Sequence, residues 1–323
     1  MVKAVRIAAV GGPEAMRLEE VALVPPGPGM VQVQNRAIGL NFIDTYHRSG
    51  LYPLPLPTGL GTEGAGVVSA VGEGADLAVG DRVAYCSAGL GSYAQALNLP
   101  ATRLVPIPQG LAFDVAAAVM LKGQTVEYLL QRCYPLQPGQ TCLFHAAAGG
   151  VGLLFGQWAS DLGVTVIGTV GSAGKAALAR DNGYAHIINY SEQDVVQAVA
   201  DLTGGAGVPV VFDGVGRDTF EASLGCLQPR GMLVSFGNAS GAPEPLPLQR
   251  LAQLGSLYVT RPTLATYTAS TQDLRASAAA VFERVLDGRL RVDIQQRYRL
   301  ADIASAHRDL EARRTTGSTV IEP

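Results

Sequence analysis

A glycine-rich turn between two apolar runs offers the most specific chemistry in this sequence. The segment Gly149–Gly152 follows the apolar run Thr141–Ala146, and apolar residues recur at helical spacing over Val151–Ala159. A buried strand, a glycine turn and the first turn of a helix aim unpaired N–H groups and a positive dipole end at a pyrophosphate. The pattern departs from G-x-G-x-x-G, because Ala147 replaces the first glycine. The turn nevertheless predicts a dinucleotide site.

The end of the next strand favours NADPH over NADH. An NAD-binding unit usually places Asp or Glu there to bind the ribose, yet no acidic residue occurs between Gly163 and Arg180. Lys175 can reach a 2′-phosphate, Ser172 offers a hydroxyl, and the helix beginning there adds its N-terminal amides. One charge-assisted hydrogen bond contributes about 1.5–3 kcal/mol. The alternative is that Lys175 is a solvated helix residue.

Strand-like and helix-like runs alternate beyond the glycine turn. They are Thr165–Val170, Ala173–Asn182, His186–Asn189, Glu192–Leu202, Val208–Asp213, Asp218–Cys226 and Met232–Phe236. This alternation predicts an α/β fold with a doubly wound parallel sheet.

The beginning and the end of the chain have a different pattern. The N-terminal part is rich in Pro and Gly and has short strand-like runs such as Met30–Gln34 and Gly66–Val71, which predicts a mostly β domain. A helical apolar stripe and a last strand, Ser318–Ile321, follow near the C-terminus and are expected to pack back onto that domain. We therefore expect one domain from residues 1–122 and 263–323, and a nucleotide-binding domain from residues 123–262.

Composition limits the functional classes. The 323 residues are 48% hydrophobic and 16% charged, with a net charge of −3, which indicates a globular protein and does not favour nucleic acid as a partner. The four cysteines are scattered and no signal peptide opens the chain, so we expect a cytoplasmic protein. Thr141–Ala159 is as long as a membrane span but is better explained as a strand–turn–helix core, so no membrane association is expected.

Several motifs along the full length carry a family resemblance. They are Gly61–Val68, Gly139–Ser160, Asn41–Tyr46, Arg48–Tyr52 and Val234–Asn238. With them the chain resembles the medium-chain dehydrogenase/reductase superfamily, and within it the quinone oxidoreductases related to zeta-crystallin. The resemblance implies a GroES-like catalytic domain, a Rossmann domain, a cofactor cleft between them, NADPH:quinone reductase activity and commonly a homodimer.

The resemblance also implies a set of residues that border NADPH. They are Asn41, Phe42, Ile43, Asp44, Thr45, Thr125, Tyr128, Gly150, Val151, Gly171, Ser172, Ala173, Gly174, Lys175, Tyr190, Gly214, Phe236, Gly237, Asn238, Ala239, Pro262, Thr263, Leu264 and Arg313. Among them Lys175, Tyr190 and Arg313 resemble the contacts to the 2′-phosphate. Gly214 is a departure, because close relatives tend to have Ser there, and it removes one side-chain contact.

The zinc ligands of related alcohol dehydrogenases are missing. Asn41 and Thr62 stand where those enzymes have Cys and His, and the cysteine-rich lobe for structural zinc is absent. Zinc needs about four N, S or O ligands, and the scattered Cys and His residues form no cluster in the sequence. We expect no metal site, and we expect His145 to be a hydrogen-bonded core residue.

Quinone reduction can proceed without a Lewis acid, because the reduced oxygen is a stabilised phenolate. It needs a flat apolar slot, hydride geometry and a modest hydrogen-bond donor. The candidates are Asn41, Tyr46 and Tyr52, with ordinary packing as the alternative for each tyrosine. Asp44 is a candidate N-cap, and Arg48 is expected either to steer an anionic intermediate or to pair on the surface.

Three functions remain open from the sequence. The first is reduction of small quinones by NADPH, and the second is reduction of α,β-unsaturated carbonyls with the same hydride donor. The third is NADPH binding with little turnover, in a structural or RNA-binding role, against which the acidic balance argues. An apolar edge strand, Ser256–Thr260, is a candidate for pairing across a homodimer.

Overall fold

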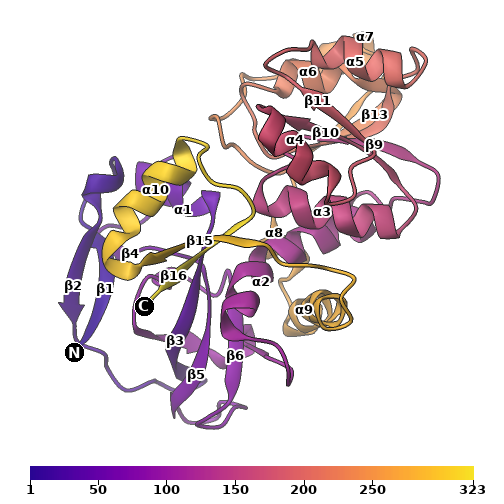
Figure 1. The fold of residues 1–323 in the computed structure, drawn as a ribbon. Helices are drawn as coiled ribbons and strands as arrows, with labels where there is room; N and C mark the ends of the chain where they lie inside the picture. Colours follow the sequence, from indigo (N-terminus) through magenta and orange to yellow (C-terminus); the bar gives the residue numbers. More distant parts are fainter. The chain divides into compact units, whose positions relative to one another are not determined.

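The computed structural model describes residues 1–323 and divides them into two compact units. Unit 1 comprises residues 1–125, 267–288 and 292–323, and unit 2 comprises residues 126–266 and 289–291. Figure 1 labels the helices and strands of each unit.

Unit 2 contains one sheet in which all neighbouring strands are parallel. Its spatial order is β11-β10-β9-β12-β13-β14, which is the order 3-2-1-4-5-6 along the chain. This is the doubly wound order of a dinucleotide-binding sheet. The strands are β9 (Thr141–Phe144), β10 (Thr165–Val170), β11 (His186–Asn189), β12 (Val208–Asp213), β13 (Leu227–Ser235) and β14 (Tyr258–Thr260).

Helices connect these strands. They are α3 (Gly150–Asp161), α4 (Ala173–Arg180), α5 (Val195–Leu202), α6 (Phe220–Gly225) and α7 (Leu248–Gln253). A π-helical turn at Leu129–Cys133 precedes the first strand, and α8 (Leu264–Tyr267) follows the last. The strands predicted at Thr165–Val170, His186–Asn189 and Val208–Asp213 are confirmed at both ends. The helix predicted from Glu192 begins later, because Asp194 caps it by accepting a hydrogen bond from the N–H of Gln197.

The segment Thr141–Ala159 forms β9, a turn and most of α3, as predicted. None of the helices combines the length and the apolar composition that a membrane span requires.

Aromatic rings fill part of the core of unit 2. The ring centroids of Phe144 and Phe155 lie 4.3 Å apart, and that of Phe212 lies 4.9 Å from Phe155. Trp158, on the same helix as Phe155, is completely buried. These contacts hold α3 against the centre of the sheet and so fix the direction of its N-terminus.

Unit 1 contains two sheets. The smaller has the order β2-β1-β4, and the larger has the order β15-β16-β3-β5-β6-β8, with β7 also paired to β3. The strands are β1 (Val2–Ile7), β2 (Arg17–Val21), β3 (Met30–Leu40), β4 (Thr58–Gly59), β5 (Glu63–Val71), β6 (Arg82–Cys86), β7 (Ala96–Pro100), β8 (Val105–Pro106), β15 (Ile294–Arg299) and β16 (Ser318–Glu322). Short 3-10 turns lie at Pro13–Ala15, Ala101–Arg103 and Leu300–Asp302.

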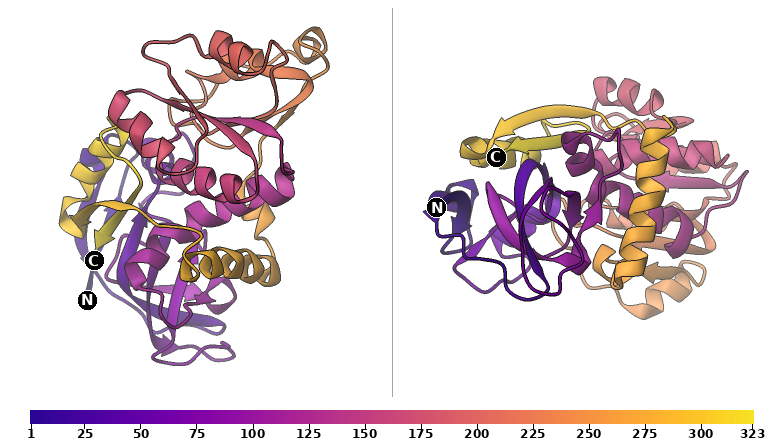
Figure 2. Two further views of the ribbon diagram at one scale, coloured as in Figure 1. Left: turned by 45° about the vertical axis from the view of Figure 1, so that its right-hand side comes forward. Right: turned by 90° about the horizontal axis from the view of Figure 1, so that it is seen from below.

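The helices of unit 1 are α1 (Phe42–Ser49), α2 (Phe113–Tyr128, whose last turn enters unit 2), α9 (Thr271–Leu286) and α10 (Ile303–Glu311). The predicted apolar stripe is the buried face of α9, which includes Leu274, Ala278 and Phe282. The predicted last strand is also confirmed: β16 pairs antiparallel with β3 in the large sheet. Figures 1 and 2 show this yellow C-terminal segment beside the indigo N-terminal strands.

Candidate active site

The glycine turn of unit 2 has the geometry that the sequence predicts. Gly149 is the extended N-cap of α3, and no side chain caps the helix. A Cβ on Gly152 would collide with the carbonyl groups of Ala146 and Ala147, so only glycine allows the helix to start this close to the strand. The first amides of α3 are therefore directed past the end of β9, as pyrophosphate binding requires.

The loop after β10 is the predicted 2′-phosphate site. Ser172 caps α4, and its hydroxyl accepts a hydrogen bond from the N–H of Lys175 at 3.4 Å. Tyr190 follows β11, and its hydroxyl lies 2.4 Å from the position that a Cβ on Gly171 would take. Ser191 donates from its hydroxyl to the carbonyl of Gly171 at 3.1 Å. The structure thus brings Gly171, Lys175 and Tyr190 to adjoining loops, and no acidic side chain stands between Gly163 and Arg180.

A buried polar chain supports the loop after β12. Asp213 accepts hydrogen bonds from the N–H groups of Val215 and Gly216 at 2.8 and 3.0 Å. Ser223 donates to the same carboxylate at 2.7 Å, so Nε2 of His145 must donate to the Ser223 hydroxyl at 3.0 Å. Burial lowers the pKa of His145, although Asp213 opposes this shift. His145 is therefore a neutral, hydrogen-bonded core residue, as predicted.

The loops after β12 and β13 pack closely on each other. A Cβ on Gly214 would lie 2.8 Å from Cζ of Phe236, and the N–H of Ala239 donates to the carbonyl of Gly214 at 3.2 Å. A Cβ on Gly237 would in turn overlap the carbonyl of Gly214. The glycine at 214 is therefore matched to the ring of Phe236, which fills the space that a serine side chain would need.

The predicted cofactor residues of unit 2 share one property: they follow the carboxyl ends of parallel strands, which meet at one edge of a sheet. Every strand of the sheet contributes: β9 through Gly150 and Val151, β10 through Gly171, Ser172, Ala173, Gly174 and Lys175, β11 through Tyr190, β12 through Gly214, β13 through Phe236, Gly237, Asn238 and Ala239, and β14 through Pro262, Thr263 and Leu264. The other predicted residues are Tyr128, which is buried in α2, and those of unit 1.

In unit 1 the predicted residues Asn41, Phe42, Ile43, Asp44 and Thr45 form the start of α1. The expectation that Asp44 is the N-cap is wrong. Asn41 occupies the cap position, and Asp44 lies three residues later, where its carboxylate accepts from the N–H of Asn41 at 2.9 Å. The sequence reasoning missed this reciprocal arrangement, in which an acidic residue at the third helical position caps the residue at the start.

The carboxylate of Asp44 is turned away from solvent. It is completely buried, and it also accepts hydrogen bonds from the hydroxyl groups of Thr62 at 3.0 Å and Tyr93 at 2.7 Å. Burial raises its pKa to about 6, while the hydrogen bond from Tyr93 is the largest opposing effect. Asp44 therefore orders the start of α1 from within the protein.

Arg48 forms an ion pair, but the expectation that it does so on the surface is wrong, because its side chain is buried. Its guanidinium donates to both carboxylate oxygens of Glu311 at 3.0 and 2.5 Å and to the carbonyl of Gly11 at 3.1 Å. It also donates to Nδ1 of His307 at 3.1 Å, and Nε2 of that ring donates to Tyr93. Burial and the neighbouring Arg48 lower the pKa of His307 to about 3. Arg48 thus joins α1 to α10.

The two candidate tyrosines lie together in unit 1. Tyr46 is buried on α1, and its ring centroid lies 5.2 Å from that of the half-buried Tyr52 in an edge-to-face contact. Two more rings extend this aromatic cluster. The ring centroid of Phe42 lies 6.2 Å from that of Tyr46, and the ring centroid of His47 lies 6.0 Å from that of Tyr52. The rings are tilted against one another and together present an aromatic surface of the kind on which a small aromatic substrate packs.

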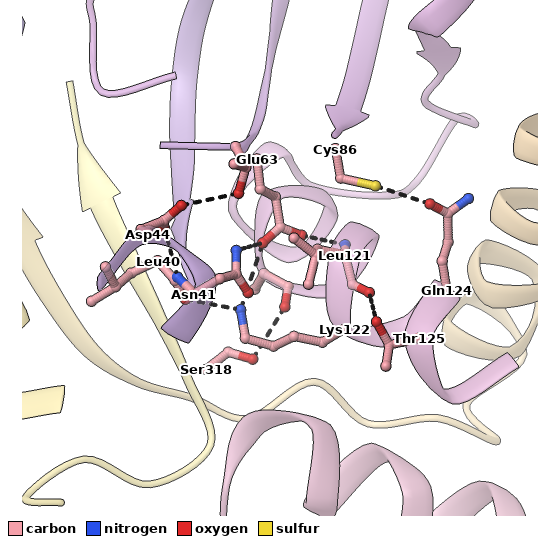
Figure 3. Close-up of polar contacts among 12 residues, drawn as sticks. Leu40, Asn41, Asp44, Glu63, Cys86, Leu121, Lys122, Gln124, Thr125 and Ser318 are labelled. Carbon is pink, nitrogen blue, oxygen red and sulfur yellow. Dashed lines mark hydrogen bonds and ion pairs between the residues drawn. The ribbon is translucent and has the colours of Figure 1, made fainter. Parts of the chain in front are cut away.

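Glu63 and Lys122 are polar residues next to Asn41 that the sequence reasoning did not single out as part of the site. Nδ2 of Asn41 donates to Oε2 of Glu63 at 2.7 Å, and Nζ of Lys122 lies 3.6 Å from the same oxygen (Figure 3). Nζ of Lys122 also donates to the carbonyl of Leu40 at 3.1 Å. In the sequence Glu63 stands between Thr62 and Gly64, and Lys122 between Leu121 and Gly123, and nothing in these neighbours indicates that the two charges pair.

The remaining predicted residues of unit 1 lie on α2 and after α10. The hydroxyl of Thr125 donates to the carbonyl of Leu121 at 2.8 Å, within α2. Arg313 is exposed directly after α10, in a left-handed conformation with φ of 58°.

The donor set of unit 1 does not fit zinc. The amide of Asn41 is hydrogen-bonded to Glu63, the hydroxyl of Thr62 is hydrogen-bonded to Asp44, and neither is a usual zinc ligand. No group of three or more His, Cys, Asp or Glu side chains in the structure could hold a metal ion.

Comparisons with known proteins agree with this architecture. Residues 27–109 match the alcohol dehydrogenase GroES-like domain, and residues 150–282 match the zinc-binding dehydrogenase family. A quinone oxidoreductase from Pseudomonas aeruginosa is 54% identical over 325 residues, covering 100% of both chains. A 2-haloacrylate reductase from a Burkholderia species is 43% identical and covers 100% of this chain and 99% of its own.

A solved structure is also similar over the full length. The crystal structure of Escherichia coli quinone oxidoreductase complexed with NADPH has a TM-score of 0.98 and 48% identity, covering 99% of this chain and 100% of that chain.

The fold and the site define a medium-chain dehydrogenase/reductase, which confirms the predicted α/β fold class with GroES-like and Rossmann-type parts. Within that superfamily, the chain belongs to the quinone oxidoreductase family.

Proposed function

We propose that this protein reduces quinones by hydride transfer from NADPH, without a bound metal. The observation that carries the proposal is the edge of the parallel sheet, where the predicted cofactor residues from Gly150 to Leu264 lie in the segments that follow all six strands. Two similarities support the same chemistry. A relative with 54% identity is a quinone oxidoreductase, and a structurally similar quinone oxidoreductase, with a TM-score of 0.98, was solved in complex with NADPH.

The residues of unit 2 fit NADPH. The open N-terminus of α3 suits the pyrophosphate, and Lys175, Ser172 and Tyr190 suit a 2′-phosphate in a loop without an acidic side chain. When bound, NADPH supplies the hydride, and the chain supplies its position and orientation.

Asn41, Tyr46 and Tyr52 are the proposed substrate-side residues. Reduction of a quinone to its hydroquinone takes one hydride and one proton from water, and the aromatic cluster provides an apolar surface for the ring. The phenol of Tyr52 can donate a hydrogen bond to the quinone oxygen as charge develops on it.

A second candidate function is reduction of α,β-unsaturated carbonyl compounds. The observation in its favour is the 43% identity to a 2-haloacrylate reductase over the full chain. An enone needs a donor at its carbonyl oxygen more than a quinone does, because the enolate is less stabilised than the phenolate. We therefore expect Tyr46→Phe or Tyr52→Phe to reduce enone turnover more than quinone turnover.

The proposal includes the organisation of the molecule. We assign catalysis to residues 1–122 with 263–323, and NADPH binding to residues 123–262. We also propose a cytoplasmic homodimer. The edge strand β14 supports the dimer, because Tyr258 and Val259 are 58% and 38% exposed beside an open row of backbone groups.

The test is steady-state oxidation of NADPH and, separately, of NADH by the purified protein with a small quinone and then with an enone. Faster turnover with NADPH and the quinone supports the proposal. Turnover with the enone alone supports the second candidate. Tight NADPH binding without turnover of either substrate overturns both.

A further inference from the structure

Glu63 is a completely buried carboxylate that joins three segments of unit 1. Its Oε2 accepts from Nδ2 of Asn41 at 2.7 Å, and its Oε1 accepts from the N–H of Leu121 at 2.6 Å. Lys122 adds an ion pair at 3.6 Å and holds the carbonyl of Leu40. Figure 3 shows this carboxylate between Asn41 and α2.

The neighbouring strand leaves room for this arrangement. A Cβ on Gly39 of β3 would overlap both the carboxylate of Glu63 and the carbonyl of Ala117 in α2. Glycine at this position therefore allows the Glu63 side chain to pass beside β3 and reach the helix. The position of the Glu63 carboxylate therefore depends on the backbone of β3 as well as on the side chains of Glu63 and Lys122.

The charge of Glu63 contributes little to stability by itself. Burial raises its pKa, and Lys122 and the hydrogen bond from Asn41 are the largest opposing effects. A buried ion pair recovers its desolvation cost only when its geometry is good, and apolar replacements are often equally stable. What the carboxylate does supply is direction, because an acceptor at this point fixes which end of the Asn41 amide faces inward.

We propose that Glu63 is a positioning residue that acts through Asn41, and this rests on the proposed quinone reductase function. Its carboxylate holds Nδ2 of Asn41, while Asp44 holds the N–H of the same residue at 2.9 Å. Side chain and backbone of Asn41 are thus fixed separately. The amide of Asn41 is therefore held in one orientation only.

Glu63→Gln is the most direct perturbation, because it keeps the size and removes an acceptor. The donors Asn41 and Leu121 contact different oxygens of Glu63, so the substituted amide presents its carbonyl oxygen to one of them and its NH₂ group to the other. The side chain of Asn41 is then displaced or rotated. Misplacement of this kind lowers kcat/KM by about 10- to 100-fold.

The first measurement is the side-chain NH₂ signal of Asn41 in protein labelled with ¹⁵N-asparagine, assigned by its loss in Asn41→Ala. This signal does not depend on activity. We expect Glu63→Gln to shift it and Asp114→Asn to leave it unchanged, since Asp114 pairs with Arg297 at 2.6 Å on the outside of α2. An unchanged Asn41 signal in Glu63→Gln overturns the proposal, whatever the activity.

The second measurement is a double-mutant cycle on kcat and KM. If Glu63 acts through Asn41, then Glu63→Gln causes no further loss of kcat/KM in an Asn41→Ala background. Losses that multiply show independent roles and overturn the proposal. Should Glu63→Gln fail to fold, as judged by circular dichroism, Glu63→Asp withdraws the carboxylate by one methylene and keeps its charge. Absence of turnover in the unmodified protein overturns the proposed function and the kinetic part of this inference, while the NMR result still decides the contact.

Discussion

Substitution of Gly214 by Ala tests how closely the loops after β12 and β13 are matched. The new Cβ would lie 2.8 and 2.9 Å from Cζ and Cε2 of Phe236, whereas ordinary contact begins at 3.4 Å. The ring must therefore retreat by about 0.6 Å, towards Phe144, whose centroid is 5.7 Å away. Overpacking of this kind costs about 1–3 kcal/mol.

A smaller effect opposes this cost. The backbone at Gly214 does not have a positive φ, so alanine is allowed there. Alanine lowers the conformational entropy of the unfolded chain, which stabilises the folded protein by about 0.4–1 kcal/mol. The net expectation is a destabilisation of about 1–2 kcal/mol. Phe236 is also a predicted cofactor contact, so we expect a higher KM for NADPH.

Urea unfolding followed by tryptophan fluorescence measures the change in stability of unit 2, because Trp158 is the only tryptophan and is buried there in α3. Phe236→Leu removes the clashing atom, so the double variant should be more stable than the sum of the two single losses by about 1 kcal/mol. Gly174→Ala is the matched control for stability, because nothing lies within 4 Å of its new Cβ. Full stability of Gly214→Ala, or strict additivity with Phe236→Leu, would refute the reasoning.

Three further predictions concern charged groups. Lys175→Ala should raise the KM for NADPH by roughly 10-fold or more and leave that for NADH unchanged, with Arg180→Ala, at the other end of α4, as the control; equal effects on both cofactors would contradict the phosphate role. Glu311→Gln should lower the free energy of unfolding by about 3 kcal/mol, because it leaves a buried guanidinium without its carboxylate, while Glu221→Gln removes an exposed pair and should have little effect in the same urea titration. The pKa of Asp44 is raised to about 6, so its contribution to stability is complete below pH 3.8 and is lost as the pH rises through 6, by roughly 3 kcal/mol. Asp44→Asn should remove this loss, so its unfolding free energy measured from pH 4 to pH 7 should rise more with pH than that of the unmodified protein; parallel curves would argue against the shift.

Most strands of unit 2 were predictable because they are short apolar runs between turn residues, whereas β13 begins five residues before the predicted Met232, in the polar segment Leu227–Gly231. Thr165–Val170 and Val208–Asp213 have the same bounds in the sequence reasoning and in the structure. Local patterns of this kind depend on neighbours in the chain, and so they can be read without the fold.

The polar contacts of unit 1 were not predictable in the same way. Arg48 binds Glu311, which lies 263 residues later, and Asn41, the N-cap of α1, binds Glu63 at the start of β5. Nothing in the local sequence distinguishes a buried arginine from an exposed one, since its burial depends on the helix that packs against it. The residues that contact NADPH remain predictions from family resemblance and from their places after the strands.

The pairing of β16 with β3 has a consequence for the order in which the protein is made. The long stretch of unit 2, residues 126–266, is continuous, so nearly all of it leaves the ribosome before the C-terminal part of unit 1. The large sheet of unit 1 lacks β15 and β16 until residues 294–322 emerge, and Arg48 lacks Glu311 until residue 311 emerges. Domains usually complete in order from the N-terminus during synthesis. Here β3 is translated before unit 2, but the sheet to which it belongs is completed only after unit 2 has been translated.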